Sequence, residues 1–280
     1  MIADIHANDH ALEAVLEDIL AQKVDMVVVN GDMVNRGPNN VAVLERLLYS
    51  DFPFSLRFTM GNHDDLMRKW VERDSDIPVA WFDDPFWQGM AWSAAQIAAA
   101  GLIPALCDLP MTQSLKLPQA PSLLISHGSP RHYREGYGEY LTDETLSEIL
   151  EMHPADILIG SHTHRPLQRR WGKHTVLNSG AVGTPFNGDP RAQYLLLHLQ
   201  ANLWQVEFRA VDYDRAAALA AFEDSGMLAE GGVSARIFYE ELRSARPLYM
   251  RFWMWTEQSQ RRKDGQSWQD FCQAFPDYWT

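Results

Sequence analysis

The feature that most constrains this chain is a series of polar clusters, each set beside a short apolar run. Apolar runs at Val27–Val29, Leu123–Ile125 and Ile157–Ile159, and an alternating run over residues 56–60, are typical of buried strands. The clusters are Asp4-Ile5-His6 at the start, then Gly31-Asp32, Gly61-Asn62-His63-Asp64, Ser126-His127-Gly128 and Gly160-Ser161-His162-Thr163-His164. In open α/β sheets, ligands bind beyond the carboxyl ends of the strands. We therefore expect the five clusters to converge on one site.

Helical patterns alternate with these strands, which indicates α/β architecture. Apolar residues at helical spacing over residues 12–20 follow a capping Asn8 or Asp9, a second helix is predicted from Pro38, and a third around residues 146–150. Alternation over residues 192–211, with Ala201-Asn202 as the turn, predicts an antiparallel hairpin. From Arg215 the pattern is helical. We thus predict a main domain over residues 1–212 and a helical extension over residues 213–280, packed on the same domain.

Residues 65–101 interrupt the alternation with an aromatic-rich segment. We expect helices that pack beside the core, and the alternative is a lid over the substrate. Aromatic residues in this segment and in residues 129–140 could stack on a nucleobase.

We count seven side chains in the clusters as candidate metal ligands. They are Asp4, His6, Asp32, Asn62, His127, His162 and His164. Seven ligands exceed what one catalytic ion needs and suit two ions that share a carboxylate. Mixed imidazole, carboxylate and amide ligands favour Mn, with Fe, Zn or Ni as alternatives. Asp-x-His and His-x-His would place both members of each pair on one side of an extended strand end.

A simpler interpretation exists for each residue taken alone. A single histidine is more often a structural residue than a ligand, and Gly-Asn-His-Asp alone could be a turn. The joint pattern of five clusters favours the metal site. His10, His132, His153, His174 and His198 lack this context, and we expect them to be structural or surface residues.

Charge and cysteine content narrow the class of function. The formal net charge is -13 and the sequence pI is about 5.1, which argues against a protein that coats nucleic acid. Bound metals would still allow a small phosphorylated substrate. Cys107 and Cys272 cannot form a disulfide framework, and we expect reduced thiols. Without an apolar run of membrane-spanning length or a secretory leader, a cytoplasmic enzyme with no membrane contact is expected, monomeric or oligomeric.

The five clusters resemble the motifs of the calcineurin-like metallophosphoesterase superfamily, in its branch of small bacterial phosphoesterases and dinucleoside polyphosphate hydrolases. The resemblance implies a four-layer α-β-β-α sandwich of two mixed sheets flanked by helices. It also implies one metal held by Asp4, His6, Asp32 and His164 and another held by Asp32, Asn62, His127 and His162. By the same resemblance His63 protonates the leaving group.

The chain departs from the family pattern at several positions. Asn35 stands where the Ser/Thr phosphatase branch has an Asp that orients the acid histidine, and Met60 stands where that branch has an Arg. Both changes weaken a protein phosphatase assignment. Arg36, together with Asn62, is predicted to bind the substrate phosphate, the alternative for Arg36 being a pair with a nearby acid. Ser161 is an insertion in the last motif. Only residues 1–3 precede Asp4, so the first strand is either very short or begins upstream.

The sequence therefore predicts a two-metal phosphoesterase that hydrolyses phosphomonoesters, phosphodiesters or nucleotide phosphoanhydrides through a hydroxide held between the ions. Three alternatives are a dedicated dinucleoside polyphosphate hydrolase, a protein Ser/Thr phosphatase, and a non-catalytic scaffold like the retromer scaffold subunit. His63 and the full ligand set favour an enzyme.

Overall fold

A computed structural model describes residues 1–278 and contains strands and helices in alternation along its first half. The strands are β1 Met26–Asn30, β2 Ser55–Thr59, β3 Thr112–Leu115, β4 Leu123–Ser126, β5 Ile157–Gly160, β6 Pro166–Trp171, β7 His174–Ser179, β8 Ala192–Gln200 and β9 Leu203–Val211. The helices are α1 Asp9–Gln22, α2 Asn40–Tyr49, α3 Asn62–Glu72, α4 Gln88–Ala99, α5 Asp143–Met152, α6 Arg215–Asp224, α7 Met227–Glu230, α8 Gly232–Ser244, α9 Leu248–Gln258 and α10 Gly265–Ala274. Short 3-10 helices occur at η1 Val79–Phe82, η2 Pro85–Trp87, η3 Ile103–Leu106 and η4 Pro276–Tyr278.

One sheet is completed by the first three residues of the chain. β1 pairs with β2 in parallel, and β8 pairs with β9 antiparallel. Ile2 pairs in parallel with Val29, and the Met1 carbonyl accepts a hydrogen bond from the Leu195 N–H at 3.0 Å. Ile2 thus forms an isolated bridge to β1, and Met1 bonds to β8, so residues 1–2 lie between the two strand pairs.

The other sheet is mixed and runs in the order β3-β4-β5-β7-β6. Its central strands β4, β5 and β7 are parallel, and the edge strands β3 and β6 are antiparallel to their neighbours. β4 and β5 are buried along their whole length, as strands covered on both faces must be.

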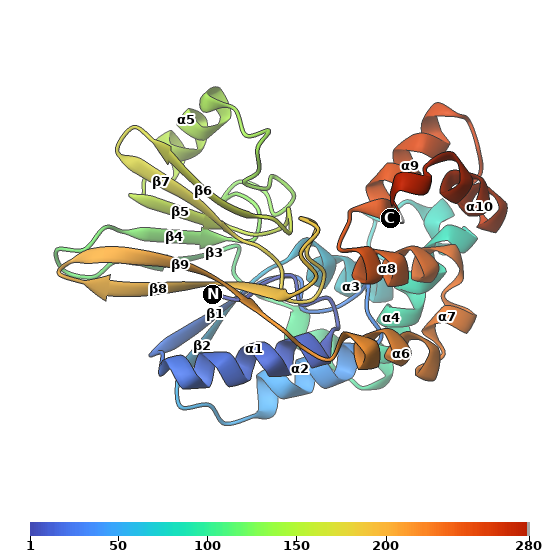
Figure 1. The fold of residues 1–280 in the computed structure, drawn as a ribbon, viewed down its shortest axis with the longest axis horizontal. Coiled ribbons are helices and arrows are strands. Elements are labelled where there is room, and N and C mark those ends of the chain that lie inside the picture. Colours follow the sequence, from blue (N-terminus) through green and yellow to red (C-terminus); the bar gives the residue numbers. More distant parts are fainter. Residues whose placement is uncertain (279–280) are drawn as a thin grey trace.

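Three apolar layers hold the sheets and helices together. Between the two sheets lie Val28, Leu123, Ile125, Ile157, Ile159, Leu177 and Leu195. Leu146, Ile149 and Leu150 of α5 cover the outer face of the second sheet, and α1 and α2 cover the first. Figure 1 shows this order of layers, with α5 above the sheets and α1 and α2 below. The predicted four-layer sandwich is confirmed.

The remaining helices gather at one end of the sandwich (Figure 1). Ile237, Leu248 and Phe252 from α8 and α9 pack into the same apolar core as Phe86 and other residues of η2 and α4. The division at residue 212 itself stays a prediction. In the described part of the chain, no helix is long and apolar enough to cross a membrane.

The predicted helix cap and hairpin turn are confirmed, and the predicted start of the second helix is corrected by two residues. Asn8 caps α1 by accepting a hydrogen bond from the Ala11 N–H, and Ala201 and Asn202 form the hairpin turn with positive φ angles of 48° and 61°. Helix α2 starts at Asn40, two residues later than the start predicted at Pro38. Strands β3 and β6 were not predicted from the sequence.

Candidate metal centre

The five polar clusters meet at one end of the sheets, as expected. Two groups of side chains each bring their potential ligand atoms within 4.8 Å of one another: Asp4, His6, Asp32 and His164 in one, and Asp32, His127 and His162 in the other. The Asn62 Oδ1 lies 3.1 Å from the His127 Nε2, so it adjoins the second group. The structure thus brings together all seven predicted ligands, and Asp32 is common to both groups.

The backbone at these residues is unusual. Asp4, His6, Asp32, His162 and His164 all have positive φ angles, of 51°, 50°, 54°, 64° and 55°. Few non-glycine residues adopt this left-handed region, and such strain concentrates at functional sites. The Asp-x-His and His-x-His pairs therefore do not lie on extended strand ends as predicted. Tight turns, not strand alternation, direct both members of each pair into the site.

Two glycines allow the loops after β1 and β2 to touch. A Cβ at Gly61 would lie 2.1 Å from the Asp32 backbone nitrogen, and a Cβ at Gly31 would lie 2.6 Å from the Gly61 Cα. Gly31 also has a φ of +77°. Any side chain here would separate Asp32 from Asn62.

The carboxylates carry acceptor atoms that no donor satisfies. Asp4 Oδ1 and Asp32 Oδ2 are buried and have no hydrogen-bond partner in residues 1–278. Asp4 Oδ1 lies 3.3 Å from His164 Nε2, and Asp32 Oδ2 lies 3.3 Å from His127 Nε2. Buried polar atoms are normally paired, and buried charges are paired or bind metals.

Hydrogen bonds to the other ring nitrogens orient the two imidazoles. His127 Nδ1 lies 2.8 Å from the Asn30 carbonyl oxygen, and His164 Nδ1 lies 2.5 Å from the Thr184 carbonyl oxygen. Each Nδ1 must donate to a carbonyl, so the neutral ring presents a lone pair at Nε2 toward the carboxylates. Ligand histidines are typically held in this way, with the other nitrogen bonded to a carbonyl. Imidazole lone pairs and carboxylate oxygens therefore face one another, and a cation between them would satisfy both. This set of ligand atoms fits divalent metal ions.

The electrostatics agree with that conclusion. Burial lowers the pKa of His6 well below its usual value and that of His162 to about 4, so both rings are neutral. Burial disfavours a charged His127, but the Asp32 and Asp4 carboxylates outweigh it and raise the His127 pKa to about 10. Burial alone would raise the Asp32 pKa, yet nearby His127 and His63 lower it well below the usual range. The site therefore attracts positive charge, which metal ions supply once His127 releases its proton.

Several supporting residues escaped the sequence analysis. Asp64 belongs to the Gly-Asn-His-Asp cluster, but no role was predicted for it. Its carboxylate accepts hydrogen bonds from the backbone N–H groups of Asp32 at 2.8 Å and Met33 at 2.9 Å. The Asn30 amide donates to the Ser126 carbonyl at 2.9 Å and to the Ser161 hydroxyl at 2.8 Å. The inserted Ser161 thus lies inside a buried polar network between the sheets. Asn30 ends β1, and only its position directly before Gly31-Asp32 could have signalled it.

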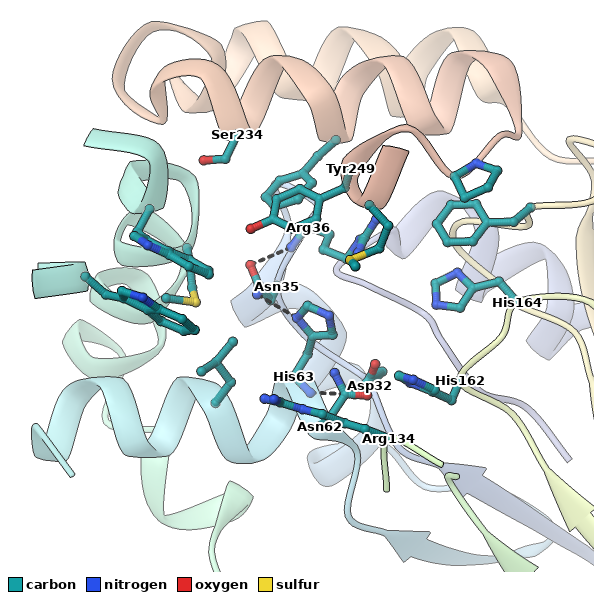
Figure 2. A pocket seen from close by; sticks show the side chains of 18 residues that line it. Asp32, Asn35, Arg36, Asn62, His63, Arg134, His162, His164, Ser234 and Tyr249 are labelled. Atoms are coloured by element: carbon teal, nitrogen blue, oxygen red, sulfur yellow. Dashed lines mark hydrogen bonds between the residues drawn. The ribbon is translucent and has the colours of Figure 1, made fainter. Parts of the chain in front are cut away.

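His63 lies beside the metal-ligand residues but belongs to neither group. Its Nδ1 lies 2.8 Å from the Asn35 Nδ2, and the Asn35 Oδ1 accepts a hydrogen bond from the Arg36 N–H at 2.7 Å. Figure 2 shows His63 and Asn35 facing each other, with Asp32 and His162 next to them. Because Asn35 donates to Nδ1, a neutral His63 carries its proton on Nε2. Burial lowers the pKa of His63 to about 3.

Arg36 has a partner from the far end of the chain. Its Nη2 pairs with a carboxylate oxygen of Glu241 on α8, and its guanidinium lies over the rings of Phe238 at 5.2 Å and Tyr249 at 5.7 Å. The Glu241 side chain is only 1% exposed and that of Arg36 11% exposed. The structure thus realises the alternative considered for Arg36, a pair with an acid, and its substrate-binding role stays a prediction.

A cavity of about 530 Å³ opens beside the candidate metal ligands (Figure 2). Asp32, Asn62, His63, His162 and His164 line one side. The other walls come from the aromatic-rich segment and from the C-terminal helices, including Trp81, Trp87, Ser234 and Tyr249. Arg134, which the sequence analysis did not single out, also lines it.

Known proteins share this architecture. The crystal structure of a metallophosphoesterase from Sphaerobacter thermophilus is 27% identical, with a TM-score of 0.64 over 87% of this chain and 98% of that one. A hypothetical protein from Pyrococcus horikoshii OT3 is 20% identical, with a TM-score of 0.65 over 81% of this chain and 92% of that one, which shows the same fold. An uncharacterized protein of Methanocaldococcus jannaschii is 24% identical over 76% of this chain and 87% of its own length. The calcineurin-like phosphoesterase family matches residues 1–166, more than half of the sequence, and the chain belongs to that family.

Proposed function

We propose that this chain is a hydrolase of phosphoesters that depends on two divalent metal ions. The observation that carries the proposal is the pair of buried, unpartnered carboxylate oxygens, Asp4 Oδ1 and Asp32 Oδ2, each facing a histidine Nε2. Asp4, His6, Asp32 and His164 would hold one ion, and Asp32, Asn62, His127 and His162 the other. Manganese is the ion we favour, with Fe, Zn and Ni as alternatives.

The ions would supply a nucleophilic water at neutral pH and would neutralise charge on the phosphoryl oxygens. The residues of the chain have three further roles in this proposal. Asn62 helps to hold the phosphoryl group, and the exposed Arg134 at the cavity adds a cation for its oxygens. His63 faces the leaving oxygen and donates a hydrogen bond or a proton from Nε2.

The Asn35 side chain limits how well His63 can act as an acid. An imidazolium would place an N–H at Nδ1 opposite the Asn35 amide N–H, and two donors repel. Protonation of His63 therefore requires Asn35 to turn its amide and give up the Arg36 N–H. We infer that alkyl esters turn over more slowly than aryl esters, whose leaving groups need little protonation.

The test compares metal-free and Mn-loaded protein on p-nitrophenyl phosphate and bis(p-nitrophenyl) phosphate. Activity should vanish after exhaustive chelation and return with Mn. His127→Ala should abolish the Mn-dependent rate, whereas His198→Ala, at an exposed position on β8, is the matched control and should retain it. Undiminished activity of metal-free protein, or equal activity of the His127→Ala variant, would contradict the proposal.

A further inference from the structure

The cavity beside the candidate metal ligands is much larger than one phosphate group. Its volume of about 530 Å³ lies within the ~300–1,000 Å³ typical of small-molecule pockets. The walls away from the ligands are mostly apolar. They are formed by Leu66, Trp81, Trp87, Met90, Phe238 and Met250. A substrate that offered only a phosphate and a small alcohol would leave these walls in contact with water.

The interior carries little charge that a second anionic group could use. Arg36 is neutralised by Glu241 and lies among aromatic rings. Arg134 makes no ion pair with the residues described, but it is exposed to solvent. A polyphosphate chain within the cavity would need several cations. The apolar side of the cavity therefore suits an uncharged group.

Two indole rings offer a flat surface to such a group. The rings of Trp81 and Trp87 stack with centroids 3.8 Å apart and planes 20° apart. Trp87 is fixed in turn by edge contacts with Phe86 at 5.5 Å and by Trp253 at 5.6 Å. A rigid aromatic surface of this kind binds planar rings with little loss of side-chain entropy.

The Tyr249 hydroxyl is a polar group within this mostly apolar region. The Tyr249 side chain lines the cavity, and none of residues 1–278 forms a hydrogen bond to its hydroxyl (Figure 2). Ligand pockets commonly combine apolar walls with a few polar groups that fix the orientation of the ligand. A heteroaromatic ring can accept or donate a hydrogen bond here, whereas an aliphatic chain cannot.

We propose that this cavity is a subsite for the uncharged, planar ring of the leaving group, and that the substrate class is phosphoesters of nucleoside-like alcohols. The proposal rests on the hydrolase function proposed above and names its substrate class. Trp81 supplies the stacking face, and Tyr249 supplies a hydrogen bond to the edge of the ring. Both stand outside the metal ligands, so they determine specificity without taking part in the reaction.

The experiment uses a pair of esters with the same kind of leaving alcohol. Adenosine 5′-monophosphate and ribose 5-phosphate both release a primary alcohol, but only the first carries a planar aromatic ring system. With Mn-loaded protein, kcat/KM should favour the nucleotide by about 5- to 150-fold, which corresponds to the ~1–3 kcal/mol of base–aromatic stacking. Trp81→Ala should bring the ratio close to one, and Trp81→Phe should keep most of it.

Trp171→Ala is the matched control, because Trp171 is also half-buried but lies on β6, away from the cavity, and this variant should keep the ratio. Equal kcat/KM for both esters, or a ratio that Trp81→Ala leaves intact, overturns the subsite while the hydrolase function stands. Binding of adenosine alone is measured by equilibrium dialysis in the same variants. If neither ester is hydrolysed, adenosine binding that Trp81→Ala removes supports the subsite, and absence of binding overturns it. The hydrolase function is decided separately, by the Mn-dependent rate on the two nitrophenyl esters.

Discussion

Arg36 was predicted to bind phosphate, and its structural surroundings predict a different phenotype on mutation. Glu241 is buried to 1% exposure and has two partners, the Arg36 guanidinium and the Tyr249 N–H, which donates to Oε1 at 2.8 Å. Arg36→Met keeps the apolar stem among the aromatic rings but removes the charge. Glu241 would then be a buried carboxylate with only one hydrogen bond.

The expected loss of stability follows from that burial. Removing one partner of a buried ion pair typically costs ~3–5 kcal/mol, because the remaining charge stays uncompensated. Arg36 is 11% exposed, so some water can reach the pair and we expect a value near ~3 kcal/mol. Adding Glu241→Gln should restore more than half of the loss, since the glutamine oxygen can still accept from the Tyr249 N–H.

Urea denaturation followed by tryptophan fluorescence measures the free energy of unfolding for the two single variants and the double variant. KM for p-nitrophenyl phosphate is measured in parallel with Mn. We expect the double variant to have a KM within about threefold of the parent, because the Arg36 guanidinium is already paired with the buried Glu241 carboxylate. A small stability loss in Arg36→Met, together with a more than tenfold rise of KM in the double variant, would refute this reasoning.

Three further predictions concern the site itself. His63→Ala should keep both metal ions and lose ~10²-fold or more in kcat on alkyl phosphates but much less on p-nitrophenyl phosphate, and equal losses on both would rule out a role at the leaving oxygen. Asp32→Asn should lower the metal content at both positions, because Asp32 is shared by the two groups, and elemental analysis that finds two ions per chain would show that it is not the bridge. Asn35→Asp places a carboxylate against His63 Nδ1, and opposite unit charges ~4 Å apart attract by about 4 kcal/mol at an effective dielectric constant of ~20, so the His63 pKa should rise. The gain should appear on alkyl esters, should be lost as pH rises through the new pKa, and should be absent when His63→Ala is combined with Asn35→Asp.

The sequence predicted the elements that depend on local patterns. Buried strands such as Leu123–Ser126 and Ile157–Gly160 are continuous apolar runs, because both faces are covered. The edge strands β3 and β6 were missed because each has only one neighbour and carries polar residues such as Gln113 and Arg169. Edge strands need no apolar run, so periodicity does not reveal them.

The metal ligands could be predicted because each follows a strand, whereas the rest of the cavity could not. Glu241 lies 205 residues from Arg36, and Tyr249 and Phe238 come from helices whose sequences carry only a packing pattern. The proposed role of residues 65–101 in stacking finds support in Trp81 and Trp87 at the cavity. No aromatic residue of the 129–140 segment lines this cavity, since Tyr137 is buried and Tyr140 is exposed elsewhere, so stacking by that segment stays a prediction.

The central claim is that two metal ions bind among these seven side chains. Anomalous diffraction from Mn-soaked crystals, collected at the manganese absorption edge, tests it most directly. We predict two peaks ~3.5–4 Å apart, one within reach of Asp4, His6 and His164, the other within reach of Asn62, His127 and His162, and both within reach of Asp32. A single peak, or peaks outside these two groups, would contradict the two-metal account.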